Sequence, residues 1–325
     1  MLYLLPSKHQ TIFQFMIYKT LGETGLEVSI LSFGASSLGG VFHDFDLNKG
    51  LKAVYTAIDL GINLIDVSPY YGFYKAEENL GKALKEIDRS KYYLSTKVGR
   101  YGQDGKKEWD YSGHRAIESV HESMERLNVD FIDLINVHDI EFANKEQVIN
   151  ETLPALWDLV DSGIVGSVGI TGLPVPLLKE ITEEAEDGMI ETVLNFCHYC
   201  LNDDALSDDI DFYKSKQIGI INASPLSMGL LSERGAPEWH PASKEIKEAC
   251  QKAANHCKSK DYRIEQLAVK YAVDHPEIAT TLISTTNPEN IKKNVEWALA
   301  PQNEELLAEV LEILKPVHRL TWENS

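Results

Sequence analysis

The chain has 325 residues, of which 43% are hydrophobic and 25% charged, and its formal net charge is −19 at pH 7. These proportions are typical of a globular protein with a large core, and the negative charge argues against nucleic acid or an anionic membrane as a partner, because both require a basic surface. The apolar runs are shorter than the roughly 20 residues of a membrane-spanning helix, and four cysteines are too few for a disulfide framework, so we expect a reducing, cytoplasmic setting.

Residues 1–15 are expected to be an extension ahead of the folded domain. They lack the basic segment and the cleavage site of a secretory signal. The first predicted element is a β-hairpin, with strands over 17–21 and 26–31 on either side of the turn-forming residues 23–25.

Short apolar runs then alternate with longer amphipathic stretches, a pattern that predicts eight strands separated by helices. The predicted strands are 29–34, 62–67, 92–98, 131–138, 166–171, 192–196, 218–224 and 280–285. The predicted helices are 51–60, 76–85, 116–127, 149–161, 176–186, 204–214, 244–259, 264–274 and 288–298. Two of these helices lie between the seventh and eighth strands, which predicts one inserted helix.

This alternation fits a barrel or a large doubly wound sheet. No G-x-G-x-x-G follows the first strand, which disfavours a dinucleotide-binding sheet. Polar and reactive residues follow many different strands, as expected where the C-terminal face of a barrel is the active site. Since no linker interrupts the pattern, we expect residues 16–325 to form a single (β/α)8 TIM barrel domain with an N-terminal β-hairpin.

Four residues at predicted strand ends suggest proton-transfer chemistry: Asp66, Tyr71, Lys97 and His138. A tyrosine hydroxyl has a pKa near 10. A nearby lysine lowers that pKa, and the lower pKa makes proton exchange near neutral pH easier. The carboxylate would hold the lysine, and the histidine would orient a substrate oxygen. The set supplies no electron acceptor, so a hydride-accepting cofactor is expected.

Each of the four also has a structural interpretation. The aspartate could cap a turn, the lysine and histidine could be ordinary polar groups, and Tyr71 could be a packing aromatic beside Tyr70. Their joint occurrence on the second, third and fourth strands favours a site.

Several segments resemble, in order, the aldo-keto reductase superfamily: YKTLGETGLEVSILSFG, DVSPYYG, STKVG, NVHD and SGIVGSVGITG. Within it, NFCHYCLND, ASPLSMGLL and PEWHPAS are most similar to the L-galactose dehydrogenase group, whose members oxidise the sugar at C1 to the lactone with NAD. The resemblance covers residues 16 to about 300 and implies a small-molecule sugar substrate. It places the catalytic tyrosine five residues after the aspartate, which selects Tyr71, with Asp66, Lys97 and His138 completing a tetrad.

The resemblance also implies where the cofactor binds. Thr171 and Asn195 would hold the nicotinamide carboxamide, with Gly172 in place of the family's asparagine, and Ala223 replaces a tyrosine that stacks on the ring in many members. The matching positions of the pyrophosphate loop are Ser224, Leu226 and Gly229.

The adenosine end is implied to lie at Ser284, Asn290 and Asn294. Members that use NADP have a lysine and an arginine where this chain has Ser284 and Asn290. Without those cations a 2′-phosphate lacks charged partners, so NAD is expected rather than NADP, although Lys292 and Lys293 lie close by in the sequence.

Other features favour structural roles. Residues 197–200 form a C-x-x-C, but Cys250 and Cys257 do not supply the second pair of a zinc site. His198 and Tyr199 follow a strand end and could line a substrate pocket. Trp239 and His240 could either line that pocket or pack within a surface loop.

Two other classes of function remain open. A glycoside hydrolase would use a pair of carboxylates such as Asp66 and Asp139, but would leave Tyr71 and Lys97 unexplained. A non-catalytic nicotinamide-binding subunit would not need the complete tetrad. Among dehydrogenase substrates, L-fucose, D-arabinose and pyridoxal stay open beside L-galactose, as does a general carbonyl reductase.

Overall fold

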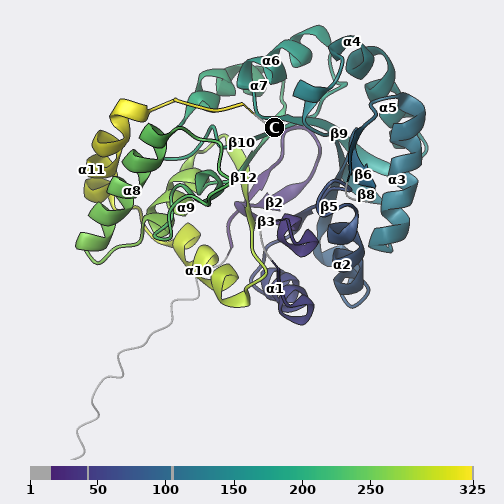
Figure 1. Cartoon of the computed structure of the whole chain (residues 1–325). Helices are drawn as coiled ribbons and strands as arrows, with labels where there is room; N and C mark the ends of the chain where they lie inside the picture. Colours follow the sequence, from purple (N-terminus) through teal and green to yellow (C-terminus); the bar gives the residue numbers. More distant parts are fainter. Residues whose placement is uncertain (1–15, 42–43, 104–105, 324–325) are drawn as a thin grey trace, which may run out of the picture.

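The computed structural model of the chain describes residues 16–41, 44–103 and 106–323. Eight parallel strands close into a barrel surrounded by helices (Figure 1), and the last of these strands pairs with the first. In their order around the barrel they are β3 (Leu31–Gly34), β4 (Leu64–Asp66), β5 (Tyr93–Val98), β8 (Ile132–Val137), β9 (Val165–Gly172), β10 (Thr192–Phe196), β11 (Gly219–Ala223) and β12 (Ile278–Ser284). The predicted (β/α)8 barrel with its N-terminal hairpin is confirmed.

All of the main helices except the last follow the strands in the predicted order. They are α1 (Leu47–Asp59), α2 (Lys75–Leu84), α3 (Gly113–Leu127), α5 (Leu153–Asp161), α6 (Val175–Glu184), α7 (Ile210–Ser215), α8 (Lys244–Ser259), α9 (Ile264–Asp274), α10 (Pro288–Leu299) and α11 (Glu304–Leu314). The inserted helix between the last two barrel strands is α8, since both α8 and α9 lie between β11 and β12. The first helix begins earlier than predicted because the Asp46 side chain caps it by accepting from the Lys49 amide at 2.9 Å.

Residues two apart in a strand point to the same side, and this alternation sets the inside of the barrel. Leu64 and Leu134 belong to an apolar cluster with residues of the N-terminal hairpin, β1 (Tyr18–Thr20) and β2 (Glu27–Ser29). Two positions further along these strands stand Asp66 and Asn136, both buried. The barrel is therefore apolar beside the hairpin and polar toward the C-terminal ends of its strands.

Three regions differ from the sequence prediction. A second hairpin follows β5, with β6 (Arg100–Gln103) paired to β7 (Lys106–Trp109). The helix α11 was also not predicted, and it packs beside α8. The predicted helix 149–161 is divided into a π-helical turn, Val148–Thr152, and α5.

The segment after α11 returns across the molecule toward the loop that follows β10 (Figure 1). The Arg319 amide donates to the Asn202 carbonyl at 3.0 Å, and the Arg319 guanidinium pairs with Asp204 and Asp208, each at 2.7 Å. None of the helices within the described ranges is long and apolar enough to cross a membrane.

Candidate active site

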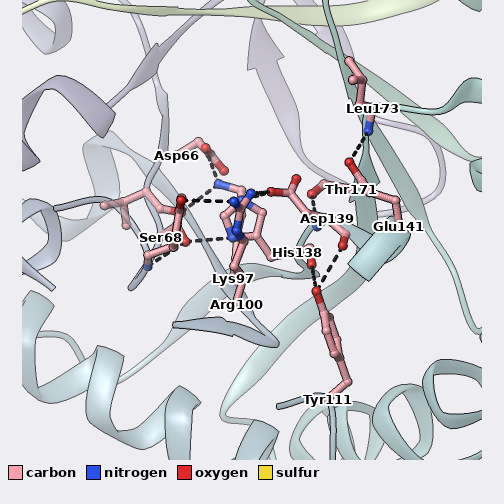
Figure 2. A network of polar contacts seen from close by, with 12 residues as sticks. Asp66, Ser68, Lys97, Arg100, Tyr111, His138, Asp139, Glu141, Thr171 and Leu173 are labelled. Carbon is pink, nitrogen blue, oxygen red and sulfur yellow. Dashed lines mark hydrogen bonds and ion pairs between the residues drawn. The ribbon is translucent and has the colours of Figure 1, made fainter. Parts of the chain in front are cut away.

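The four residues of the predicted tetrad lie together at the C-terminal ends of three neighbouring barrel strands. Asp66 ends β4, Lys97 is near the end of β5, and His138 directly follows β8. Tyr71 lies in the turn between β4 and α2, and its ring centroid is 5.1 Å from Lys97 Nζ and 5.7 Å from the His138 ring. The sequence-predicted set is thus brought together, and Figure 2 shows Asp66, Lys97 and His138 with the polar contacts around them.

Lys97 is held by a buried ion pair. Its Nζ is 2.6 Å from Asp66 Oδ2 and donates to the Val67 carbonyl at 2.8 Å. Ser95 donates to the other Asp66 oxygen at 2.8 Å, so the carboxylate is fixed on both sides. Burial is the largest single effect and lowers the Lys97 pKa, but the attractions of Asp66, Tyr71 and Asp139 together outweigh it, and the net effect raises the pKa. Lys97 is a fixed cation at physiological pH.

The Tyr71 hydroxyl does not have the lowered pKa that the sequence led us to expect. Burial raises the pKa of Tyr71 to about 12; Lys97 lowers it and Asp66 raises it, and together they do not reverse the effect of burial. In the protein without ligands Tyr71 is therefore a neutral phenol. It can donate a proton as it stands, and accepting one requires prior ionisation.

His138 is neutral and oriented. Burial, together with the charges of Lys97 and Arg100, lowers the pKa of His138 well below its usual value. Its Nδ1 lies 3.0 Å from Ser68 Oγ, which also accepts from the Tyr70 amide at 3.1 Å. The other ring nitrogen, Nε2, is left for Asp139 Oδ2 at 3.6 Å or for a substrate atom.

Arg100 belongs to this site and was not predicted from the sequence. Its guanidinium pairs with Asp139, lies 3.9 Å from the centre of the Tyr70 ring and donates to the Tyr70 hydroxyl at 3.0 Å. The Tyr70 hydroxyl is thus already engaged by Arg100, whereas Tyr71 lies beside Lys97 and His138. The sequence does contain one indication, since Arg100 follows Lys97 by three residues at a strand end.

Asn195 fits a nicotinamide carboxamide. Its Nδ2 donates to the carbonyls of Gly172 and Leu173 at 2.8 and 2.9 Å, but its buried Oδ1 has no hydrogen-bond partner within the described chain. A buried acceptor left in this way is costly unless a ligand donates to it. Thr171, at the end of β9, accepts from the Asp139 amide at 3.0 Å and so connects this position to the tetrad.

The predicted pyrophosphate loop has an unusual backbone. Ser224, Ser227 and Met228 all have positive φ, at 57°, 48° and 54°, and Gly229 has φ of 105°. Leu226, between them, is half-buried. Left-handed conformations of non-glycine residues are strained and occur often at ligand sites.

His240 holds this loop in place. It is buried, its Nε2 lies 3.1 Å from the Ser227 carbonyl, and its Nδ1 accepts from the Ala242 amide at 3.1 Å. Of the two interpretations of Trp239 and His240, packing within the loop therefore applies to the histidine, whereas Trp239 is 50% exposed.

The predicted adenosine end lies apart from the tetrad, at β12 and α10. Ser284 is exposed at the end of β12 and its Oγ accepts from the Ser37 amide at 3.1 Å. Asn290 is exposed and Asn294 half-buried, and both lie on α10. Lys292, also exposed, pairs with Glu289 at 2.8 Å.

The C-x-x-C segment has a packing role. Cys197 and Cys200 are free and buried, and burial raises the pKa of both thiols. Tyr199 stacks on Tyr271 of α9 with the ring centroids 5.3 Å apart. His198 bonds to the Phe196 carbonyl and to Thr321. Tyr199 therefore packs against a helix of the outer ring instead of lining a pocket.

A sequence profile of the Aldo/keto reductase family matches residues 30–315. L-galactose dehydrogenase of Arabidopsis thaliana is 43% identical over 313 residues, which cover 94% of this chain and 97% of that protein. D-arabinose 1-dehydrogenase of Saccharomyces cerevisiae is 35% identical over 258 residues, which cover 76% of this chain and 75% of that protein. Among solved structures, the aldo-keto reductase AKR11C1 from Bacillus halodurans, in its holo form, has a TM-score of 0.79 and 26% identity over 95% of this chain and 99% of that one.

Proposed function

Because this chain belongs to the aldo/keto reductase family, we propose that it is an NAD-dependent dehydrogenase that oxidises an aldose at C1 to the aldonolactone. L-galactose is the first candidate substrate, since the Arabidopsis enzyme named for it is similar over nearly the whole of both chains. The observation that carries the proposal is the buried Lys97–Asp66 pair beside Tyr71, with a neutral His138 against the same ring.

Each member of the tetrad has a distinct role in this proposal. Tyr71 exchanges the proton of the C1 hydroxyl, and Lys97 stabilises the phenolate that accepts it. Asp66 fixes the lysine, which otherwise would be an unpaired buried charge. His138, neutral and bonded through Nδ1 to Ser68, presents Nε2 to the substrate oxygen.

The residues present fit a nicotinamide cofactor, which when bound supplies the hydride acceptor that the side chains lack. Asn195 and Thr171 would hold the carboxamide, and the loop containing Ser224, Leu226 and Gly229 would hold the pyrophosphate. Ser284 and Asn290 offer no positive charge to a 2′-phosphate, which supports NAD over NADP.

The proposed function is tested by following absorbance at 340 nm with a panel of substrates. L-galactose, L-fucose, D-arabinose and pyridoxal would each be offered with NAD and with NADP. We expect the highest kcat/KM for an aldose with NAD. Turnover with pyridoxal alone would refute the sugar assignment, and turnover with NADP alone would refute the cofactor assignment.

Two alternatives predict different results in the same assay. A glycoside hydrolase would give no reduction of the cofactor, and the structure disfavours it because Asp66 and Asp139 are each paired with a cation. A non-catalytic subunit is suggested by the probable voltage-gated potassium channel subunit beta of Arabidopsis thaliana, which is 24% identical over 303 residues. Such a protein would bind NAD with little or no turnover.

The role of Tyr71 is tested by Tyr71→Phe, which removes only the hydroxyl. We expect kcat to fall by about 10²- to 10⁴-fold, the usual contribution of a positioned acid or base, while NAD binding by fluorescence titration is retained. Tyr213→Phe is the matched control, because the Tyr213 hydroxyl is buried in α7 and has no hydrogen-bond partner in the described part of the chain. Near-normal turnover of Tyr71→Phe would remove this residue from the mechanism.

A further inference from the structure

The Arg100–Asp139 pair is a second buried ion pair in the site, in addition to Lys97–Asp66. The exposed fractions of the two side chains are 5% and 7%. Arg100 comes from the β6–β7 hairpin and Asp139 from the end of β8, where it follows His138 directly. Figure 2 shows the contact between Arg100 and Asp139 as a dashed line within the polar network.

This pair is difficult to explain by stability. Removing two charges from water costs several kcal/mol per ion, and buried ion pairs can often be replaced by apolar residues without loss of stability. The pair is also incompletely satisfied, since the buried Nε of Arg100 has no hydrogen-bond partner among the described residues. A polar ligand could accept the hydrogen bond that this buried donor does not make within the protein.

The position of Asp139 relates the pair to the reacting carbon. Asp139 Oδ2 lies 3.6 Å from His138 Nε2, the nitrogen that faces the reacting oxygen in the proposed mechanism. Adjacent hydroxyls of a sugar are about one hydrogen-bond length apart. A substrate whose C1 oxygen meets His138 Nε2 therefore brings its C2 hydroxyl within reach of Asp139 and Arg100.

We propose that Arg100 and Asp139 form a recognition site for the C2 hydroxyl of the substrate and so select polyhydroxy compounds over simple alcohols and aldehydes. The inference deepens the proposed function and rests on it. Asp139 accepts the hydrogen bond of that hydroxyl, and Arg100 donates to its oxygen.

Trp109 adds an aromatic surface next to the Arg100–Asp139 pair. It is the partner of Arg100 in the hairpin register and lies 5.7 Å from the guanidinium by its ring centroid. Its ring is 5.5 Å from that of Phe142, and the residue is still 39% exposed. A few fixed polar groups beside exposed aromatic surface are typical of small-molecule sites, and a sugar presents both hydroxyls and an apolar C–H face.

The test compares L-galactose with 2-deoxy-L-galactose in the wild-type protein and in Asp139→Asn. Both kcat/KM and the binding constant from titration calorimetry are measured for each sugar. In the wild type we expect the deoxy sugar to be worse by on the order of 100-fold, because the missing hydroxyl leaves buried polar groups unpaired. In Asp139→Asn the kcat/KM values of the two sugars should become nearly equal, mainly because the value for L-galactose falls.

A double variant, Arg100→Met with Asp139→Leu, separates recognition from folding. We expect it to keep the wild-type melting temperature and NAD binding, because it removes both charges together, and to lose the preference for the C2 hydroxyl. The matched control is Asp133→Asn, which breaks the Arg89–Asp133 pair at the other end of β8, where the two atoms are 2.5 Å apart. That variant should retain the preference.

The outcomes distinguish this inference from the proposed function. If the protein oxidises aldoses but Asp139→Asn and the double variant keep the preference for the C2 hydroxyl, the role of the pair is overturned and the proposed function stands. Binding of the sugar that depends on both the C2 hydroxyl and Asp139, without oxidation, would support the pair and overturn the dehydrogenase. Absence of both binding and oxidation of any polyhydroxy compound would overturn both.

Discussion

The Tyr71 hydroxyl is subject to opposing effects. Burial raises its pKa to about 12, and the Lys97 cation next to the ring lowers it without reversing that shift. The resting phenol is therefore suited to donate a proton, as needed when a carbonyl is reduced. Oxidation of an alcohol uses the phenolate, which becomes more abundant as the pH rises.

We therefore predict an alkaline pH profile for oxidation. The kcat/KM for the aldose should increase between pH 7 and 10, approaching tenfold per pH unit, because the fraction of Tyr71 in the phenolate form increases by that factor below its pKa. The rate is measured at saturating NAD over this range. Lys97→Met should move the profile to still higher pH, and an optimum at or below pH 7 would contradict the assigned role.

Asp66, Lys97 and His138 were predicted to lie together because they stand at strand ends, where the barrel geometry brings them together, and the family resemblance selected Tyr71. The sequence did not predict the direction of the Tyr71 pKa, because that depends on how deeply the hydroxyl is buried. Arg100 was missed for a related reason, since only the hairpin that carries it turns its side chain back toward Asp139.

The turn that carries Tyr71 depends on two glycines in close contact. Gly72 has φ of 66°, and a Cβ there would lie 2.1 Å from the Gly39 carbonyl oxygen. A Cβ on Gly39 would in turn lie 2.5 Å from the Tyr71 carbonyl oxygen. The backbone of this turn therefore rests directly on the short helix after β3, which fixes the position of the tyrosine.

We predict that Gly72→Ala displaces Tyr71 and destabilises the fold by roughly 2–4 kcal/mol, from left-handed strain plus a backbone clash. Gly163→Ala is the matched control, because Gly163 has φ of 72° but an added Cβ would have no atom within 4 Å. It should cost only about 1 kcal/mol and leave activity unchanged. Melting temperature and kcat are compared for both variants, and equal losses would argue against the contact.

The end of β12 and the first turns of α10 give a prediction about the cofactor. Introducing Ser284→Lys with Asn290→Arg should raise kcat/KM for NADP by about tenfold or more, since the 2′-phosphate gains charge-assisted hydrogen bonds. The NAD value should change little. Kinetics with both cofactors test this, and an unchanged NADP value would place the phosphate elsewhere, for example near Lys293.

The elements that the sequence did not predict fall into two kinds. The β6–β7 hairpin has no alternation of apolar residues, and its pairing is short and local, so its sequence resembles that of a loop. The helix α11 does have a readable pattern, because Leu306, Val310 and Leu314 recur every four residues and are buried. The barrel strands were predictable because their burial on both sides gives continuous apolar runs.

Across the whole molecule, several histidines are buried in their neutral form. Burial is the main cause that lowers the pKa of His138, His198 and His240. A histidine whose folded pKa is depressed binds a proton more readily in the unfolded chain. Its contribution to stability is thus present above the unfolded pKa, near 6.5, and is lost as the pH falls below it.

We predict that the stability of the protein decreases between pH 7 and 5, by up to about 1.4 kcal/mol per pH unit for each such histidine. Asp139 opposes this trend, because burial raises its pKa. Thermal unfolding followed by circular dichroism at several pH values measures the slope. His240→Gln retains a donor and an acceptor and should reduce the slope, whereas an identical slope would exclude His240 as a contributor.

The segment after α11 has a consequence for the order in which the protein is completed during synthesis. Arg319 is tied to Asp204 and Asp208, and Trp322 lies 4.8 Å from the His240 ring, which in turn holds the Ser227 carbonyl. All eight barrel strands are translated before residues 315–323. A nascent chain can therefore close its barrel while the loops after β10 and β11 still lack these contacts, which form only after residues 315–323 have left the ribosome.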